Sequence, residues 1–173
     1  MLREALLQSL DQIRRILDRL DALASPDGGW LYAETGIGRH LRHINDHFLA
    51  LIEGGEAGWV DYNRRHRDSP VECDLQAGRD QLEGILDWCR ETELEERSLR
   101  IVSEIDCRAS HSLSFESNLS RELLYLINHT IHHAAYIRLR LAQEGVELPP
   151  DIGLAPGTAS YLRDLEQART CAP

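Results

Sequence analysis

The feature that most constrains the fold is an unbroken stretch of helix-forming residues late in the chain. Between Ser120 and Glu144 the sequence contains neither Gly nor Pro, and most of its residues favour helix. One long helix is therefore predicted from Asn118 to Glu144, closed by Gly145. A helix of this length needs other helices to cover its apolar side, so the chain is expected to fold as a helical bundle.

Two histidines of this helix are predicted to share one face. His129 and His133 are four residues apart, the spacing that places side chains above one another on a helix. A second cluster, His40, His43 and His47, lies at the edge of the apolar stripe of another predicted helix. One imidazole from that helix and two from the last would supply three protein ligands for a metal ion with an open position. Periodicity does not decide which of the three binds, and a single inward histidine is more often an ordinary core residue.

The other elements follow from apolar periodicity and from turn residues. The polar stretch from Glu56 to Ser69 is predicted to be a long loop, and the alternating stretch from Leu99 to Phe115 a short two-stranded hairpin. The first helix is predicted to end in a turn at Ser25-Pro26-Asp27-Gly28-Gly29, because Pro lacks an amide donor and Gly accepts positive φ. Trp30 to Tyr32 is expected to form an apolar connector, with Thr35 as the N-cap of the helix that follows. The predicted fold class is all-α, a four-helix bundle with a β-hairpin inserted before the last long helix, in one domain over residues 1–173. The predicted helices are 2–24, 35–53, 74–92 and 118–144, with a short helix at 158–168 that Thr158 would cap. The apolar stripe predicted to face the core from the first helix consists of Leu6, Leu10, Ile13, Leu17 and Leu20.

The composition limits partners and compartment. A formal net charge of −10 argues against nucleic acid or an anionic membrane as partner. The N-terminal residues lead into an amphipathic pattern rather than an apolar signal segment, and the longest apolar run, Leu123 to Ile127, is too short to span a bilayer. The four cysteines form no CxxC pair, which fits reduced and buried thiols in a cytoplasmic protein. They are Cys73, Cys89, Cys107 and Cys171.

Several other kinds of catalytic site are excluded by missing motifs. The chain contains no HExxH motif, no Glu-x-x-His pair of the kind found in di-iron bundles, no phosphate-binding glycine loop and no GxSxG elbow. Lys is absent, so a Schiff base cannot form. The histidine clusters therefore remain the main candidates for chemistry.

The two histidine-bearing segments resemble motifs of the DinB/YfiT-like superfamily. The run Ile37-Gly38-Arg39-His40-Leu41-Arg42-His43-Ile44 is similar to its second-helix motif, and His129-Thr130-Ile131-His132-His133 is similar to its fourth-helix HxxxH motif. The resemblance covers nearly the whole chain in helix order, in the loop after the second helix and in the tail. It implies a four-helix bundle in up-down-down-up order, often a homodimer, with one metal-binding histidine from helix two and two from helix four. Carried over, the metal ligands are His43, His129 and His133.

The resemblance also implies a class of chemistry. Characterised relatives include transferases and isomerases that use low-molecular-weight thiols. The first hypothesis is therefore a metal-dependent enzyme of the thiol S-transferase or hydrolase type that acts on a small molecule. It would use a divalent metal (Zn, Ni or Fe) and a low-molecular-weight thiol as cosubstrate. His47, His132 and His40 are candidates for orienting a ligand or moving a proton, and Tyr62, Arg64 and Arg65 for contacting an anionic substrate. The alternative is a non-catalytic, dimeric stress-response or scaffold bundle with a structural or vestigial metal site.

Overall fold

The computed structural model describes residues 1–23 and 27–170, and most of these residues are helical. The end of the first predicted helix, at Ala24, and the proposed turn residues Ser25 and Pro26 lie outside the described residues, as does Cys171. The helices are α1 (Leu2–Asp21), α2 (Asp27–Glu34), α3 (Ile37–Gly54), α4 (Leu75–Glu91), α5 (Leu119–Gln143) and α6 (Pro156–Thr170), with a 3₁₀ turn η1 (Pro70–Glu72). Within these described ranges, no helix is both long and apolar enough to span a membrane.

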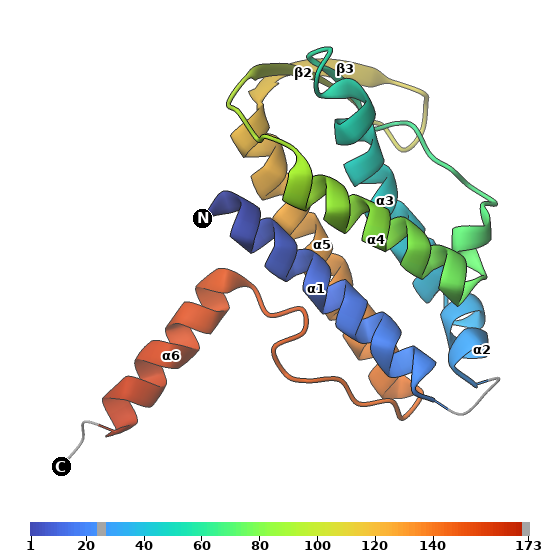
Figure 1. Cartoon of the computed structure of the whole chain (residues 1–173), viewed down its shortest axis with the longest axis vertical. Helices are drawn as coiled ribbons and strands as arrows, with labels where there is room; N and C mark the ends of the chain where they lie inside the picture. The colour runs from blue at the N-terminus through green and yellow to red at the C-terminus, as the bar shows by residue number, and fades with distance from the viewer. Residues whose placement is uncertain (24–26, 171–173) are drawn as a thin grey trace.

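Four of the helices form a bundle. α1 packs against α4 and α5, and α3 packs against the same two helices from the other side. The colour gradient in Figure 1 shows that α1 and α5 run in one direction and that α3 and α4 run in the other. Because α3 and α5 are neighbours, the two histidine-rich segments of the sequence face a common seam.

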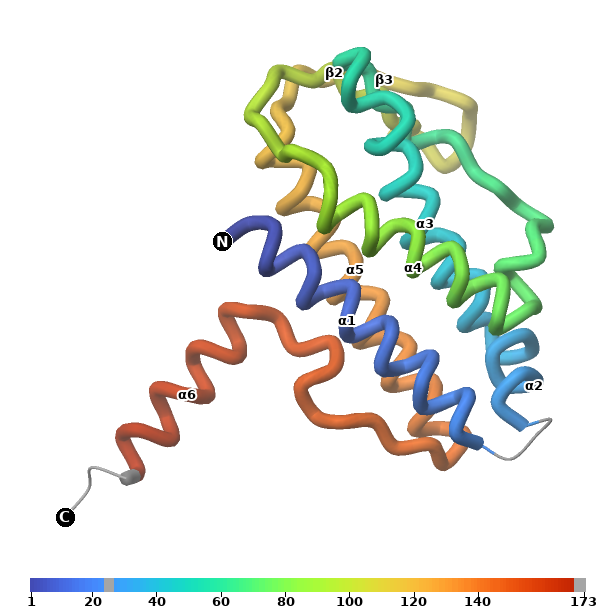
Figure 2. Tube along the Cα trace, viewed as in Figure 1, coloured from blue at the N-terminus to red at the C-terminus, as the bar shows by residue number. Residues whose placement is uncertain are grey.

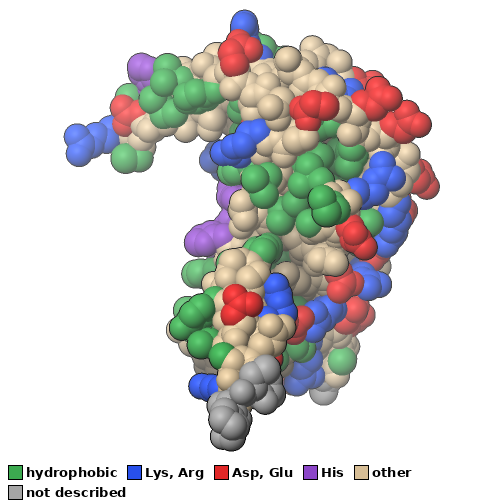
Figure 3. Space-filling view, turned by 90° about the vertical axis from the view of Figure 1, so that its left-hand side faces the viewer, with side chains coloured by type: hydrophobic (Ala, Val, Ile, Leu, Met, Phe, Trp, Pro, Cys, Tyr) green, Lys and Arg blue, Asp and Glu red, His purple; other side chains and the backbone are tan. Residues whose placement is uncertain are grey.

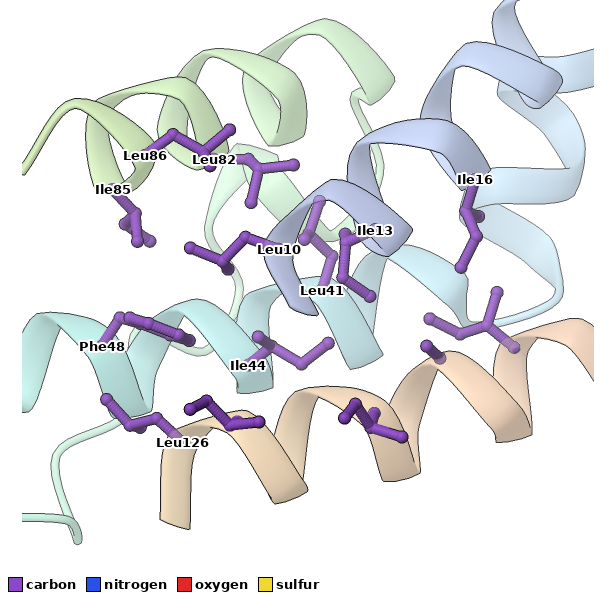
Figure 4. Packing of buried hydrophobic residues seen from close by; sticks show 14 of the residues in the cluster. Leu10, Ile13, Ile16, Leu41, Ile44, Phe48, Leu82, Ile85, Leu86 and Leu126 are labelled. Carbon is purple, nitrogen blue, oxygen red and sulfur yellow. The ribbon is translucent and has the colours of Figure 1, made fainter. Parts of the chain in front are cut away.

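The core of the bundle consists of the apolar stripes that the periodicity predicted. On α1, every apolar position chosen from the sequence is buried, and the stripes of α3 and α4 are buried over most of their length. Figure 4 shows these side chains pointing toward one another between the helices. The labelled residues come from four helices and include Leu10, Ile13, Leu41, Ile44, Leu82 and Leu126.

A small sheet lies at one end of the bundle, and its extent corrects the all-α prediction. The predicted hairpin is present as β2 (Ser98–Glu104) paired antiparallel with β3 (Ser112–Asn118). A third strand, β1 (Trp59–Asp61), pairs parallel with β2 inside the stretch that was predicted to be an irregular loop. The protein is therefore mostly helical with a three-stranded mixed sheet, an α+β arrangement. The strand escaped detection because it is short and its partner lies far along the chain.

The segment before α3 was also predicted wrongly. Trp30 to Tyr32 belong to helix α2, not to a connector. Gly28 was interpreted as a turn residue, but a Cβ there would lie 2.0 Å from the carbonyl oxygen of Leu20, so this glycine permits close packing of α2 on α1. Thr35 does not cap α3 and instead donates its hydroxyl to the backbone of α2. The residue that precedes α3 is Gly36, with a φ of 80°.

The other helix ends agree more closely with the sequence. Asn118 caps α5 by accepting the amide of Arg121, and Asp74 caps α4 in the same way. Gly145 follows α5 with a φ of 75°. The last helix begins at Pro156, so Thr158 lies within it and is not its N-cap.

The tail between α5 and α6 runs back over the bundle. Arg15 of α1 pairs with Asp151 at 2.6 Å, and Arg138 of α5 donates to the carbonyl oxygen of Pro150 at 2.6 Å. Helix α6 then projects away from the bundle, as Figures 1 and 2 show. The tail therefore ties α1 to α5 through its contacts with Arg15 and Arg138.

Candidate metal centre

The seam between α3 and α5 carries most of the protein's histidines. The amphipathic pattern of α3 turns its apolar stripe toward the core, which leaves the histidines along the edge that meets α5. On α5, His129 and His133 project toward this edge from successive turns. Figure 3 shows histidine side chains in a hollow beneath an arm that projects from the upper end of the molecule, the end that carries the sheet in Figure 1.

Three of these histidines form a compact group. Ring nitrogens of His43, His129 and His133 all lie within 4.8 Å of one another. Their ring centroids are 4.5 to 4.9 Å apart, and the rings meet edge to face rather than stacked. Three imidazoles that converge in this way could hold a metal ion. These are the residues that the family resemblance selected, and their role as ligands remains a prediction.

The group is electrostatically suited to a cation. Burial is the main cause that lowers the pKa values of His43 and His129 to about 4 and that of His133 to about 3. Repulsion among the imidazoles lowers each pKa further. The three rings are therefore neutral at pH 7, the protonation state in which imidazole donates a lone pair to a metal.

One nitrogen of this group has no partner within the described structure. Nε2 of His129 is buried and accepts or donates no hydrogen bond. A buried polar atom without a partner costs free energy, so such atoms are rare in folded proteins. A bound metal ion would satisfy this nitrogen, which means that the residues present fit a metal.

His40 contacts the group from one side. Its Nδ1 lies 2.9 Å from Nδ1 of His133, so one ring donates a hydrogen bond and the other accepts it. The ring of Tyr136 covers His40 at a centroid distance of 4.3 Å. Because Nδ1 of His133 is engaged by His40, the other ring nitrogen of His133 is the one free to bind a metal. His40 therefore has the geometry of a residue that orients a ligand.

His47 forms the inner wall of the site. It is buried, and its ring lies 4.8 Å from that of His43 and 4.3 Å from that of His129. The rings of Tyr62 and Tyr125 cover its other side. Burial is the main cause that lowers its pKa to about 2, and its Nδ1 has no hydrogen-bond partner in the described structure. His47 is not one of the three grouped residues.

The remaining candidates from the sequence have different surroundings. His132 is exposed, and its ring touches only the edge of the site at 5.5 Å from His133. Tyr62 is buried and donates its hydroxyl to Glu122 at 2.8 Å, so it supports the wall rather than facing a ligand. Arg64 is exposed and pairs with Glu53 at 3.1 Å. Arg65 is half-buried, and its positive charge contributes to the lowered pKa values of His43 and His129.

A second buried polar cluster lies on α3 and was not predicted from the sequence. Asp46 is buried and accepts hydrogen bonds from Arg42 at 2.8 Å and from His66 Nδ1 at 2.7 Å. Arg42 also pairs with Glu72 at 2.9 Å. An acidic residue between two inward-facing histidines of one helix is the signal that could have revealed it.

The cysteines do not join the site. Cys89 is buried, as predicted, and burial raises the pKa of its thiol to about 12. Cys73 and Cys107 are exposed, contrary to the prediction that the cysteines are small core residues. All three are free thiols, and none belongs to the three-histidine group. Structural zinc sites usually have four ligands, often including cysteine, so the group resembles an open site more than a closed one.

Comparison with known proteins gives one partial match. A protein of Rhizopus delemar described as FK506-binding protein 5 is 32% identical over 111 residues, which cover 60% of this chain and 28% of that protein. This chain thus corresponds to little more than a quarter of the length of that relative. No family model matches the chain, and no solved structure matches it.

Proposed function

We propose that this protein is a DinB/YfiT-like metalloenzyme that binds one divalent metal ion, Zn, Ni or Fe, through His43, His129 and His133. The observation that carries the proposal is the convergence of three neutral imidazoles, with nitrogens within 4.8 Å of one another, from two helices of a bundle. The buried, unpartnered Nε2 of His129 supports it independently. The directions of α1, α3, α4 and α5 also agree with the up-down-down-up order of that superfamily.

Each surrounding residue has a role that follows from its contacts. A divalent metal with an open position acidifies a bound thiol or water, so that a nucleophile is available near neutral pH. His40 fixes the orientation of His133 through the bond between their Nδ1 atoms. His47, Tyr62 and Tyr125 form an aromatic wall that excludes water from the inner side. We propose a small-molecule substrate and a low-molecular-weight thiol as cosubstrate, acting within a homodimer.

The non-catalytic alternative makes a different prediction about the same site. A structural metal would be held by a closed set of four protein ligands. The described group offers three, which favours a site with an exchangeable position. The name of the Rhizopus delemar relative gives no basis for FK506 binding here, because the match spans only 28% of that protein.

Elemental analysis of protein purified without a histidine tag or a nickel column tests the proposal. We expect near-stoichiometric metal in the wild type and none in His129→Ala, because the two remaining histidines would bind the metal too weakly to retain it. His132→Ala is the matched control: it removes an adjacent imidazole that faces solvent and should retain the metal. If His129→Ala kept full occupancy, or if the wild type neither contained nor rebound a divalent metal, the proposed centre would be wrong.

A further inference from the structure

Arg65 differs from Arg42 and Arg64 in having no ion pair with a carboxylate in the described structure. Arg42 pairs with Asp46, and Arg64 pairs with Glu53. The hydrogen bonds of Arg65 in the described structure go only to backbone carbonyl oxygens, and both come from Nη1. Its Nε and Nη2 groups therefore remain available to a ligand.

The loop that carries Arg65 is fixed next to the histidines at two points. The first point is Tyr62, whose backbone carbonyl oxygen accepts a hydrogen bond from Arg65. The centroid of the Tyr62 ring lies 5.0 Å from that of His47. On the other side of Arg65, His66 is bonded to Asp46 through its side chain and its backbone amide. Asp46 and His47 are consecutive residues of α3, so both contacts hold Arg65 beside the turn of α3 that carries the site.

The charge of Arg65 acts on the metal-site residues. It contributes to the lowered pKa values of His43, His47 and His129. Burial is also the main cause that lowers the pKa of Arg65 itself. The nearby carboxylate of Asp46 raises this pKa and so offsets part of the effect of burial, but it forms no ion pair with Arg65 in the described structure. A partly buried guanidinium without an ion pair is a costly arrangement that an anionic ligand would relieve.

Arg65 is accessible from a surface hollow. A cavity of about 360 Å³ is lined by Asn63, Arg65 and Arg67 from the loop and by residues 103–107 at the end of β2. Two of the hairpin residues are acidic, but neither forms an ion pair with an arginine of this hollow in the described structure. Figure 3 shows arginine side chains as well as histidines around the hollow beneath the projecting arm. A small molecule entering here would meet the guanidinium of Arg65, on the loop whose neighbouring residues contact His47 and Asp46.

We propose that Arg65 binds the carboxylate of a small-molecule ligand whose other end reaches the three-histidine group. The guanidinium fork matches a carboxylate in shape and charge, and such a charged hydrogen bond is stronger than a neutral one. This inference rests on the proposed function and narrows it: the substrate or the thiol cosubstrate carries an anionic group. It also separates Arg65 from Arg64 and Tyr62, whose side chains already have partners.

A binding experiment with matched thiols tests this role without measuring activity. The protein is loaded with Co²⁺, whose absorption reports both metal binding and sulfur coordination. Thioglycolate, 3-mercaptopropionate and 4-mercaptobutyrate are compared with 2-mercaptoethanol, which has no charge. We expect at least one carboxylate thiol to bind about tenfold more tightly than 2-mercaptoethanol, as a hydrogen bond to a charged group predicts. Arg65→Gln should remove this preference and leave Co²⁺ binding intact.

Arg64→Gln is the matched control, because it removes the neighbouring positive charge from the surface and should keep the preference. The proposal is overturned if the wild type shows no preference for a carboxylate thiol, or if Arg65→Gln retains it. Failure of the wild type to bind Co²⁺ overturns the metal centre itself, whereas Co²⁺ binding without the preference overturns only the role of Arg65.

Discussion

Two clusters of buried polar groups lie on helix α3, and they differ in how completely their atoms are paired. Both oxygens of Asp46 accept hydrogen bonds, from Arg42 and from His66. The neighbouring His47 is similarly buried, yet its Nδ1 has no partner, and the same is true of Nε2 of His129. The first cluster combines opposite charges, while the second gathers neutral rings that lower one another's pKa.

The difference separates a structural network from a ligand site. A buried polar group that the protein satisfies by itself fixes the local structure. Buried polar atoms that converge and remain unsatisfied indicate that something outside the chain satisfies them. The paired cluster should therefore matter most for stability, and the unpaired cluster for the response to pH and for holding a metal.

The largest effect is expected from removing the centre of the paired cluster. Asp46→Ala leaves Arg42 and His66 without their shared acceptor, and breaking a buried ion pair costs about 3 kcal/mol of the free energy of unfolding. Asp18→Ala is the control, because Asp18 is exposed and Arg79 keeps a second carboxylate partner in Asp21, so the loss should be less than about 1 kcal/mol. Urea unfolding measures the change in the free energy of unfolding for both variants. Equal losses in the two variants would show that Asp46 is not a structural centre.

A smaller effect is expected when the metal-free protein is acidified. His47 has a folded-state pKa of about 2, whereas in the unfolded chain it binds a proton near its ordinary pKa of 6.5. Below pH 6.5 the unfolded state thus takes up a proton that the folded state does not, and stability falls. At pH 5 the loss from this residue is about 2 kcal/mol. Unfolding of chelator-treated protein from pH 7 to pH 5 should show this loss, reduced in His47→Phe, and a flat wild-type profile would contradict it.

The smallest effect is expected at the residue that orients His133. His40→Phe removes the Nδ1 bond to His133 and keeps an aromatic ring against Tyr136. Loss of such a supporting contact weakens metal affinity by about tenfold. Competition with a coloured chelator measures the change, and His132→Ala should leave the affinity unaltered. If both variants behaved alike, the hydrogen bond of His40 would have no role in holding the metal.

The parts of the fold that depend on local pattern were predicted well from the sequence. A stripe of apolar residues at helical spacing is a property of one segment, so the buried face of α1 could be read without knowing its partners. All five chosen positions are buried in the structure. They are Leu6, Leu10, Ile13, Leu17 and Leu20.

The parts that depend on distant contacts were not predictable in this way. β1 is a strand only because it pairs with β2 about forty residues later, and its own three residues carry a weak pattern. α2 contains two glycines that suggested a turn, because the packing of Gly28 on α1 is invisible in the sequence. Both errors arose where tertiary contacts outweighed local preference.

The site shows the same division. The i, i+4 spacing placed His129 and His133 together correctly, since it is a property of one helix. The choice among His40, His43 and His47 depends on how α3 is rotated against α5, and here the family resemblance, not periodicity, selected His43. The position of Arg65 depends on the hydrogen bond between His66 and Asp46, which joins the loop to α3; helical periodicity could place Asp46 on α3 but could not identify its partner.

The strand that the sequence did not reveal has a consequence for binding entropy. β1 holds one end of the loop at residues 62–69, η1 holds the other, and the bond between His66 and Asp46 fixes its middle. A segment held at three points has lost most of its conformational freedom on folding, before any ligand arrives. Little further ordering is then required when Arg65 meets an anion, so a larger share of the interaction energy appears as affinity. This three-residue strand thus helps to pre-organise the side chain that we assign to ligand recognition.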